Sequence, residues 1–379
     1  MIKMYDELTM DEIDWESKKD GSLIKQYFEP LMKNGISKFI ENVKADLYLV
    51  EIDDFILPLS VNDTEFTNSY VASPFTHYIS YAKEELWELY NKPLERLLGA
   101  IIDILGFVLQ KSNINKVVVV NNWFLSTNLL EPSLSFDQLQ RLTLFLTEKF
   151  KQHTILFRSI NNSLHQNISK FLQEIGYQNV MSRSIYLFNQ NQENQLSAKQ
   201  KKLLKQDEKL ILNKDYQVKQ VAEVDIERIQ ELYNSLYIQK YSANNPQFTL
   251  DFYRNIYLNQ LFSFKLICKN DIVLGIVGML IRDNVLTTPI LGYESTREKS
   301  DGLYRVLSFL ITQEIMDHHY IGHRSAGAGE FKRKRGSVQE NEYTYFYQKH
   351  LSLSKKLSWK IVKFIMDKIV EPLAKKKGF

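Results

Sequence analysis

Residues 262–293, FSFKLICKNDIVLGIVGMLIRDNVLTTPILGY, contain the clearest secondary-structure pattern in the chain. Three apolar, β-branched runs are separated by two polar triplets of the kind that forms tight turns. The pattern predicts an antiparallel meander with strands at 262–268, 272–281 and 285–293.

A helix and two further strands follow this meander. Apolar residues between Leu303 and Ile315 recur at the spacing of one buried helix face. After the helix we expect a strand at 320–325, a glycine-rich turn, the basic run 331–336 and an aromatic closing strand at 342–348.

The first half of the chain shows the same order of elements. We expect a hairpin at 46–61, a strand at 117–120, a helix at 136–150, a strand at 154–160, a short helix at 168–175 and a closing strand at 183–188. Strand, helix, strand and closing strand therefore occur twice, which indicates an internal duplication with little residue identity. Between the copies, Ala198–Lys209 is either an exposed helix or part of a flexible linker.

Composition narrows the class of protein. The chain has 379 residues and a net charge of +3, but eight lysines against Asp367 and Glu371 give the residues from Leu351 onward +6, which leaves −3 for the rest. No positive field covers the whole chain, which argues against a general nucleic-acid-binding surface. The single cysteine, Cys268, excludes an intrachain disulfide and a cysteine-based zinc site.

No targeting or membrane-spanning pattern is evident. The first thirty residues are acidic, which is the opposite of a secretory leader. The longest apolar stretch, Leu97–Leu109, is shorter than the roughly 20 residues that a membrane span needs, so it predicts a buried helix. We therefore expect a cytoplasmic protein.

Several motifs in the second half resemble a known family. The basic segment 196–209 is similar to the helix that opens the C-terminal domain of Fem-type, GNAT-like transferases. Phe331-Lys-Arg-Lys-Arg-Gly336, after Ser325-Ala-Gly-Ala-Gly329, resembles the signature near the end of that domain. The resemblance covers about 196–350, and the first half matches in element order alone.

This resemblance implies an α+β fold with two tandem GNAT-like domains. Each would have a mixed, mainly antiparallel sheet flanked by helices, and a basic amphipathic helix would follow the second domain. The expected bounds are 1–192 for a non-catalytic N-terminal domain, 193–352 for the domain with the active site and 353–379 for the tail. One departure is Arg297–Tyr304, which has one glycine and two acids where acetyl-CoA enzymes have a glycine-rich phosphate loop.

Four residues are candidates for catalysis. Glu294 follows an apolar strand, and partial desolvation there would raise its pKa and make it a base, although a solvated turn residue is the plainer interpretation. Tyr304, in the first turn of the next helix, is a proton donor to the leaving group or a packing residue, and Tyr293 lies beside Glu294. His323, before the glycine-rich turn, is a further candidate base.

The glycine-rich turn and the basic run are candidates for donor binding. Small residues admit a ligand closely, and successive backbone N–H groups can hold an anion. The expected donor-binding residues are Ser325, Gly327, Ala328, Gly329, Lys332, Arg333 and Arg335. A tight turn followed by a solvated basic face is the alternative. His318, His319 and His323 do not make a metal site, because adjacent helical histidines point in different directions.

The tail 354–377 has an apolar side with Leu357, Ile361 and Ile365 and a lysine-rich side. Trp359 and Phe364 suit a lipid headgroup boundary, so the helix either contacts an anionic membrane surface or packs on the body.

These features together predict an N-acyltransferase that moves an activated acyl or aminoacyl group onto an amine by direct attack. The acceptor would be a small molecule or a cell-envelope type of amine, and no cofactor would be permanently bound. Acyl-CoA, an acyl carrier protein and aminoacyl-tRNA remain open as donors. A catalytically degenerate scaffold that binds a ligand, a membrane surface or a partner is the alternative of another class.

Overall fold

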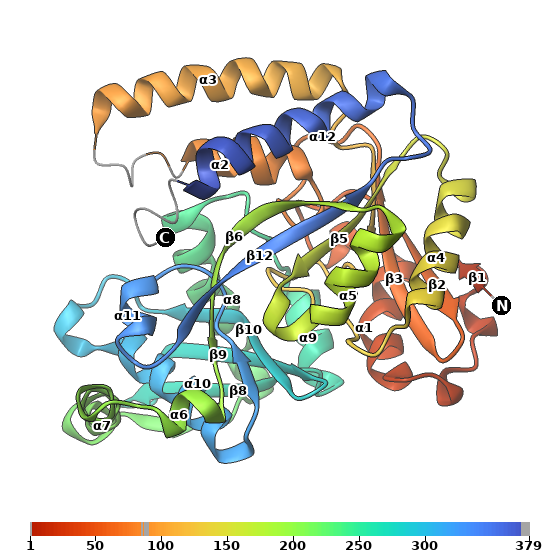
Figure 1. Cartoon of the computed structure of the whole chain (residues 1–379). Coiled ribbons are helices and arrows are strands. Elements are labelled where there is room, and N and C mark those ends of the chain that lie inside the picture. The colour runs from red at the N-terminus through yellow and green to blue at the C-terminus, as the bar shows by residue number, and fades with distance from the viewer. Residues whose placement is uncertain (1, 85, 87–90, 373–379) are drawn as a thin grey trace. The chain divides into compact units, whose positions relative to one another are not determined.

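The computed structural model describes residues 2–84, 86 and 91–372. The chain divides into two compact units, each made from separate stretches of sequence. Unit 1 contains residues 1–182, 242–247 and 343–379, and unit 2 contains residues 183–241 and 248–342. Each unit is a sheet flanked by helices (Figure 1).

Unit 1 contains seven strands or parts of strands. Its helices are α1 (Gly21–Asn34), α2 (Tyr81–Glu84), α3 (Lys92–Lys111), α4 (Phe136–Lys149), α5 (Asn162–Ile175) and α12 (Leu353–Ile365). Its strands are β1 (Ile2–Tyr5), β2 (Asp46–Ile52), β3 (Phe55–Asn62), β4 (Val117–Val120), β5 (Thr154–Ile160), the start of β6 (Gln178–Phe188) and the end of β12 (Val338–Tyr347). Their order is β1-β2-β3-β4-β5-β12-β6, and β4–β5 is a parallel pair.

Unit 2 contains the predicted meander. Its helices are α6 (Gln190–Asn194), α7 (Ala198–Asn213), α8 (Ile226–Tyr233), α9 (Leu250–Leu258), α10 (Leu303–His318) and α11 (Gly329–Arg333). Its own strands are β7 (Gln217–Lys219), β8 (Ser263–Lys269), β9 (Ile272–Arg282), β10 (Val285–Tyr293) and β11 (Ile321–His323). From the end of β6 their order is β6-β11-β10-β9-β8-β7. The predicted mixed, mainly antiparallel sheet with flanking helices is confirmed.

The two turns of the meander show why its polar triplets matter. Asn270 and Asp271 have φ of 51° and 60°, and Asp283 and Asn284 have φ of 48° and 63°. Two-residue hairpin loops need positive φ at both central positions, and Asn and Asp tolerate that conformation better than other non-glycine residues. The triplets therefore fix the register of β8, β9 and β10.

The closing strands are exchanged between the two repeated segments. β12, which ends the second segment, pairs antiparallel with β5 of the first, with Phe346 opposite Leu156. β6, which ends the first segment, pairs antiparallel with β11 of the second, with His323 opposite Leu187. The linear division at 192 and 352 stays a prediction, whereas the observed units divide β6 and β12 within each strand.

The long apolar stretch and the tail differ from expectation. The stretch Leu97–Leu109 is in α3, but it is buried on one side only, since Leu97, Ile101 and Ile104 are exposed. On α12 the buried apolar residues are Trp359 and Val362, so Trp359 packs in the core of unit 1 and does not lie at a headgroup boundary. No helix in the described part of the chain is long and apolar enough to cross a membrane.

A glycine allows helix α8 to lie directly on β10. A Cβ atom at Gly292 would be 2.6 Å from the carbonyl carbon of Leu232 and 2.7 Å from the backbone nitrogen of Tyr233. These are backbone atoms in the last turn of α8, so they cannot rotate away as a side chain can. The absent side chain therefore sets the distance between helix and sheet in unit 2.

We predict that Gly292→Ala lowers the free energy of unfolding by about 1–3 kcal/mol, the usual cost of overpacking. Urea denaturation would measure the change. Gly99→Ala in α3 is the matched control, because among the described residues the neighbour of a Cβ atom there is Leu86 Cδ1, at an ordinary contact distance of 3.8 Å. Alanine also favours a helix, so the control should be neutral or stabilising. Equal losses for both variants would contradict the close helix contact.

Candidate active site

The candidate site of unit 2 lies where two parallel strands separate. β10 and β11 pair over three residues, and the last pair is Thr287 with His323. β10 continues to Tyr293, and its register with β9 shifts between Thr287 and Ile290, which marks a bulge at Thr288-Pro289. Pro289 has no N–H group to donate to a ladder, so the sequence itself favours irregular pairing there. β10 thus continues past the end of β11, and the two strands are no longer paired beyond His323, an interruption of the sheet that we call the opening.

Thr287 and His323 form the vertex of this opening. Residues paired directly in a parallel sheet point to the same face, so the hydroxyl and the imidazole are neighbours. Both side chains are 1% exposed. Thr287 Oγ1 is buried and has no hydrogen-bond partner in the part of the chain that the structure describes. A buried hydroxyl group without a hydrogen-bond partner is rare in folded proteins, so Thr287 is a candidate for contact with a ligand.

His323 is the first member of a buried polar chain. Its Nε2 lies 3.3 Å from Glu342 Oε2, and Arg183 Nε donates to Glu342 Oε1 at 2.8 Å. Glu342 is 3% exposed. Burial by itself would raise the pKa of Glu342, but the charge of Arg183 and the contact with His323 together hold it at about 2. The carboxylate is therefore ionised, and it orients the imidazole.

The other ring nitrogen of His323 faces the glycine-rich turn. The backbone N–H of Ser325 donates to His323 Nδ1 at 3.3 Å. Because Nδ1 accepts this bond it has a lone pair, and in the neutral ring the proton is then on Nε2, the nitrogen that lies nearest Glu342. A carboxylate, an imidazole and a basic nitrogen aimed at a turn are the parts of a general base.

The pKa of Glu294 is shifted in the direction opposite to the expected one. Its Oε2 accepts from Arg228 Nη2 at 2.9 Å, and its Oε1 accepts from Thr296 Oγ1 at 2.8 Å. These bonds, with Arg228 as the larger influence, lower the pKa of Glu294, so the expectation of a raised value is wrong. An ionised carboxylate paired with an arginine is a weak base.

Tyr293 and Tyr304 lie near each other, with ring centroids 6.1 Å apart, and Phe331 lies 4.9 Å from Tyr304. Burial raises the pKa of both tyrosines, and they remain protonated at neutral pH. Tyr293 is six residues beyond Thr287 on β10, a separation of roughly 20 Å at strand spacing. The structure therefore brings Tyr293, Tyr304 and Glu294 to one end of the opening and His323 to the other.

The cations of the basic run contact groups of unit 2 itself. Lys332 Nζ is buried and donates to the carbonyls of Arg324, Ser325 and Ala326 at 2.5, 3.3 and 2.8 Å. Burial, with help from the charges of Arg324 and Arg183, holds the pKa of Lys332 well below its ordinary value. Lys332 therefore stabilises the start of the glycine-rich turn through the backbone carbonyls of residues 324–326.

The two arginines of the run have partners far away in sequence. Arg333 Nη1 donates to Tyr186 Oη at 3.1 Å and to Gln339 Oε1 at 2.9 Å. Arg335 binds the fully buried Asp207 of α7 with two nitrogens. The segment 198–209 is therefore not a flexible linker: the expected, mostly exposed helix is confirmed, and the buried Asp207 anchors it.

The glycine-rich turn contains three residues with positive φ, namely Ser325 at 53°, Gly327 at 75° and Ala328 at 48°. A Cβ atom at Gly329 would be 1.9 Å from Tyr186 Oη, so this glycine admits the tyrosine. Gly327 and Ala328 are exposed at the surface. Donor binding by Ser325, Gly327, Ala328, Gly329, Lys332, Arg333 and Arg335 stays a prediction.

The sequence did not single out Glu342, Arg183 or Thr287. Glu342 and Arg183 stand at the beginnings of the two strands predicted to close the repeats, and nothing local relates them to His323. Only the exchange of β6 and β12 makes them neighbours. Thr287 gave a local signal, because it precedes Thr288-Pro289 inside an otherwise regular strand.

The corresponding strand ends of unit 1 are occupied by the chain itself. β4 and β5 pair through Val120 and Phe157, and the segment 121–131 that follows β4 is almost entirely buried. Asn122 Nδ2 donates to Ser60 Oγ at 2.7 Å, and the backbone N–H of Asn128 donates to Ser159 Oγ at 3.1 Å. This segment therefore fills the space beside β5.

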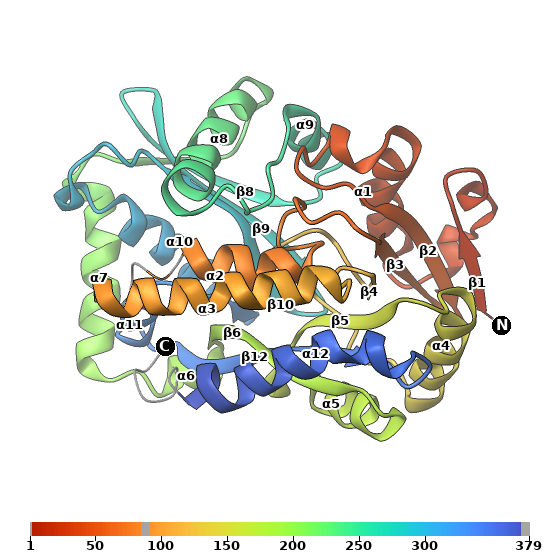
Figure 2. The same cartoon turned by 90° about the horizontal axis from the view of Figure 1, so that it is seen from above.

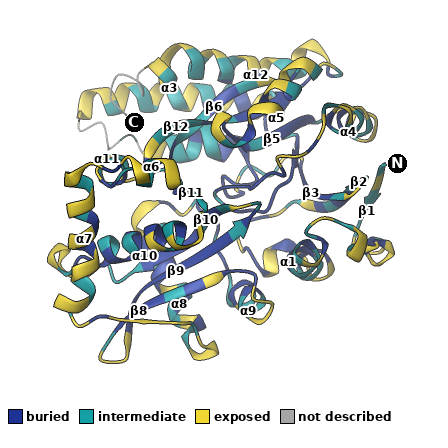
Figure 3. Cartoon of the chain, turned by 60° about the horizontal axis from the view of Figure 1, so that its bottom comes forward, coloured by how far each residue is buried: buried dark blue, intermediate teal, exposed yellow. Residues whose placement is uncertain are grey.

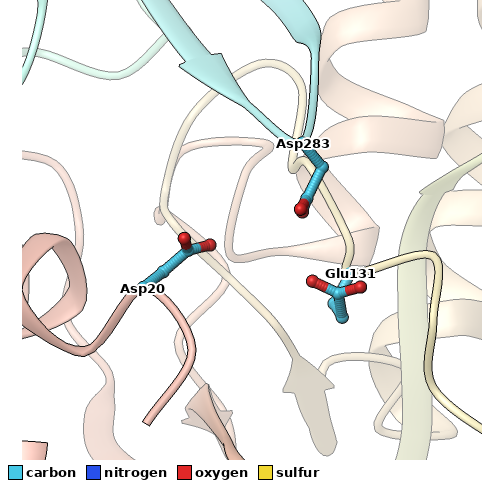
Figure 4. Close-up of side chains that lie close together, drawn as sticks. All are labelled: Asp20, Glu131 and Asp283. Carbon is cyan, nitrogen blue, oxygen red and sulfur yellow. The ribbon is translucent and has the colours of Figure 1, made fainter. Parts of the chain in front are cut away.

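Glu131 ends that segment, and its carboxylate is fully buried. Figure 4 draws it near Asp20, which also belongs to unit 1. Lys19 Nζ lies 2.6 Å from Glu131 Oε2. Burial would raise the pKa of Glu131, but Lys19 and Ser133 keep it below its ordinary value, so unit 1 itself neutralises this acid.

No family model matches the sequence, and no curated protein is significantly similar to it. Among solved structures, a conserved protein of unknown function from Bacteroides thetaiotaomicron VPI-5482 is 11% identical, with a TM-score of 0.52 over 92% of this chain and 100% of that one. This likeness shows a common fold and nothing about activity.

Two further solved structures are similar over a smaller part of the chain. FemX is 9% identical over 65% of this chain and 83% of its own, with a TM-score of 0.47. L-PGS from Bacillus licheniformis is 13% identical over 60% and 78%, with a TM-score of 0.45. The structural neighbours thus include the Fem type that the motifs of the second half resemble.

We predict that Glu342→Gln destabilises the protein by about 3 kcal/mol at neutral pH, because the variant loses the buried carboxylate whose ion pair with Arg183 and contact with His323 hold its pKa at about 2. The folded pKa of Glu342 lies below its unfolded value, so its contribution is present above about pH 4.5 and is lost as the pH falls towards 2. The difference between wild type and variant in urea denaturation should therefore shrink across this range.

Glu330→Gln is the matched control, since Glu330 makes an exposed ion pair with Lys334. We expect this variant to unfold like the wild type. A deficit of Glu342→Gln that stays constant from neutral to acid pH would contradict the ionised, buried carboxylate.

Proposed function

We propose that the chain is an N-acyltransferase whose chemistry takes place in unit 2, with His323 as the general base. One observation carries this proposal, namely the buried chain from His323 through Glu342 to Arg183 beside the hydroxyl of Thr287. It lies at the point where the pairing of β10 and β11 ends, and there we propose that the acyl donor binds.

In the proposed reaction the acceptor amine replaces the Ser325 N–H as the partner of His323 Nδ1, gives its proton to that nitrogen and attacks the carbonyl carbon of the donor. Glu342 stabilises the imidazolium that forms, as a carboxylate does in a catalytic triad. The Thr287 hydroxyl is available to donate to the oxyanion. The C–N bond forms, the bond to the donor's sulfur or oxygen breaks, and the leaving group takes the proton, so no covalent enzyme intermediate is needed.

The donor is proposed only as a class, an activated acyl or aminoacyl ester or thioester. Acyl-CoA, acyl carrier protein and aminoacyl-tRNA all belong to that class, and each would act as a co-substrate. Lys332 and Arg335 already bind groups of unit 2, which limits what they offer to a phosphate. Arg333 and the exposed turn 327–328 remain the proposed contacts.

We also propose that the two copies differ in function. We assign the tandem GNAT-like arrangement, with a second copy at about 193–352 and a first copy at 1–192 that has no catalytic role. The buried segment 121–131 supports this assignment, because it packs beside β5 of the first copy. We expect the protein to act in the cytoplasm.

The test begins with a thermal-shift panel of acyl-CoAs, acyl carrier proteins and charged tRNA, followed by an assay of donor cleavage with amine acceptors. His323→Gln should lower kcat by about 10²–10⁴-fold, the usual contribution of a general base. His318→Gln is the matched control, because His318 is exposed at the end of α10, and it should retain full activity.

Glu294→Gln separates the two candidate bases. Wild-type kcat in His323→Gln together with a large loss in Glu294→Gln would contradict the proposed base and restore Glu294. If no member of the panel raises the melting temperature and no donor is cleaved, the degenerate scaffold is the better account.

A further inference from the structure

Two helices of unit 1 have an apolar side that is exposed in the described part of the chain. More than half of the large hydrophobic side chains that are exposed among the described residues lie on α3, on α12 and on the turn Met366–Val370 that follows α12. Figure 2 shows the two helices side by side along one face, and Figure 3 shows exposed residues along both. Scattered single residues would need no explanation, but a continuous patch does.

On α3 the exposed residues follow helical spacing. Leu94, Leu97, Ile101 and Ile104 recur at intervals of three and four residues, so they share one face, and Phe107 continues it. Ile104 is 69% exposed and Phe107 is 63% exposed. The opposite side of α3 is the one that packs, since Gly106 and Leu109 are buried. The helix therefore has two apolar sides, of which the fold uses one.

α12 has the same arrangement. Leu353, Leu357 and Phe364 lie on one face, and their side chains are 80%, 49% and 63% exposed. Trp359 and Val362 lie on the opposite side and are buried in the core cluster that also contains Leu109 of α3. Because α3 and α12 pack on one cluster through their inner sides, their outer sides belong to one surface, which we call the α3–α12 face.

The charge of this face is positive. The segment from Leu353 to Val370 contains five lysines and one acid, Asp367, which is paired with Lys363. Lys360 and Lys368 are exposed, and Lys360 lies between Leu357 and Phe364 in sequence. Lysines beside exposed leucine and phenylalanine are the pattern of a helix that lies in a lipid headgroup layer, since the ammonium groups reach anionic phosphates while the stems cover apolar surface.

We infer that the α3–α12 face binds the surface of an anionic lipid bilayer, with both helices parallel to the membrane. A second copy of the chain is the other apolar occupant to consider. A symmetric dimer places the same patch of two copies together, so the lysines of α12 would add like charge to the contact. Anionic lipid complements both the apolar residues and the lysines. This inference does not depend on the proposed transferase activity.

The experiment is flotation of the 379-residue protein with phosphatidylcholine vesicles, with and without phosphatidylglycerol. We expect binding to the vesicles that contain phosphatidylglycerol, and weaker binding at high salt. Ile104→Ser and Phe364→Ser should each lower the partition coefficient about tenfold, since each removes one inserted apolar side chain. Lys360→Ala should lower it about fivefold, the effect of one lysine near such a surface.

Leu144→Ser is the matched control, because Leu144 is an exposed leucine of unit 1 on α4, away from the α3–α12 face. It should bind vesicles like the wild type, and thermal melts should show that all the variants are folded. The inference is overturned if the wild type does not bind anionic vesicles, or if Leu144→Ser weakens binding as much as Ile104→Ser. It is also overturned if sedimentation shows a dimer that Ile104→Ser dissociates while vesicle binding is absent.

Discussion

The structure of unit 2 depends on one buried carboxylate. Glu342 is excluded from water, and such a charge is costly unless donors surround it. Its partners come from two other strands, Arg183 from β6 and His323 from β11. The carboxylate is therefore satisfied only when β6, β11 and β12 assemble, and the same assembly places an oriented imidazole at the opening beside β10. The contacts of Glu342 with Arg183 and His323 therefore contribute both to the stability of unit 2 and to the proposed chemistry.

The exchange of closing strands gives the two units different neighbouring strands. In unit 2 the strand neighbouring β11 is β6, and it brings Arg183 into the site. In unit 1 the strand neighbouring β5 is β12, whose paired residues Tyr345, Phe346 and Tyr347 are aromatic. The buried asparagines after β4 form hydrogen bonds within unit 1, so the segment that contains them packs against β3 and β5. The same order of strands and helices thus forms a buried polar cluster in unit 2 and a packed interior in unit 1.

Much of the fold could be predicted, because the signals were local. Polar triplets marked the turns of the meander, and apolar spacing marked α4 and α10. The site was only partly predictable. His323 was found, but Glu342 and Arg183 were missed, since strand exchange is not visible in local pattern. The cations of the basic run suggested a ligand site. The sequence does not reveal that Asp207 and Tyr186, which are distant along the chain, bind two of these cations. The apolar stretch at 97–109 suggested burial, although only tertiary packing decides how many sides of a helix are covered.

The state of His323 offers the most direct test of this account. Long-range ¹H–¹⁵N spectra of the protein labelled at histidine would report which ring nitrogen carries the proton. The account predicts that the neutral ring carries its proton on Nε2, near Glu342, and has a lone pair on Nδ1. In Glu342→Gln this preference should weaken. A proton fixed on Nδ1 in the wild type, or spectra unchanged by Glu342→Gln, would contradict the central claim that Glu342 orients His323 as a base.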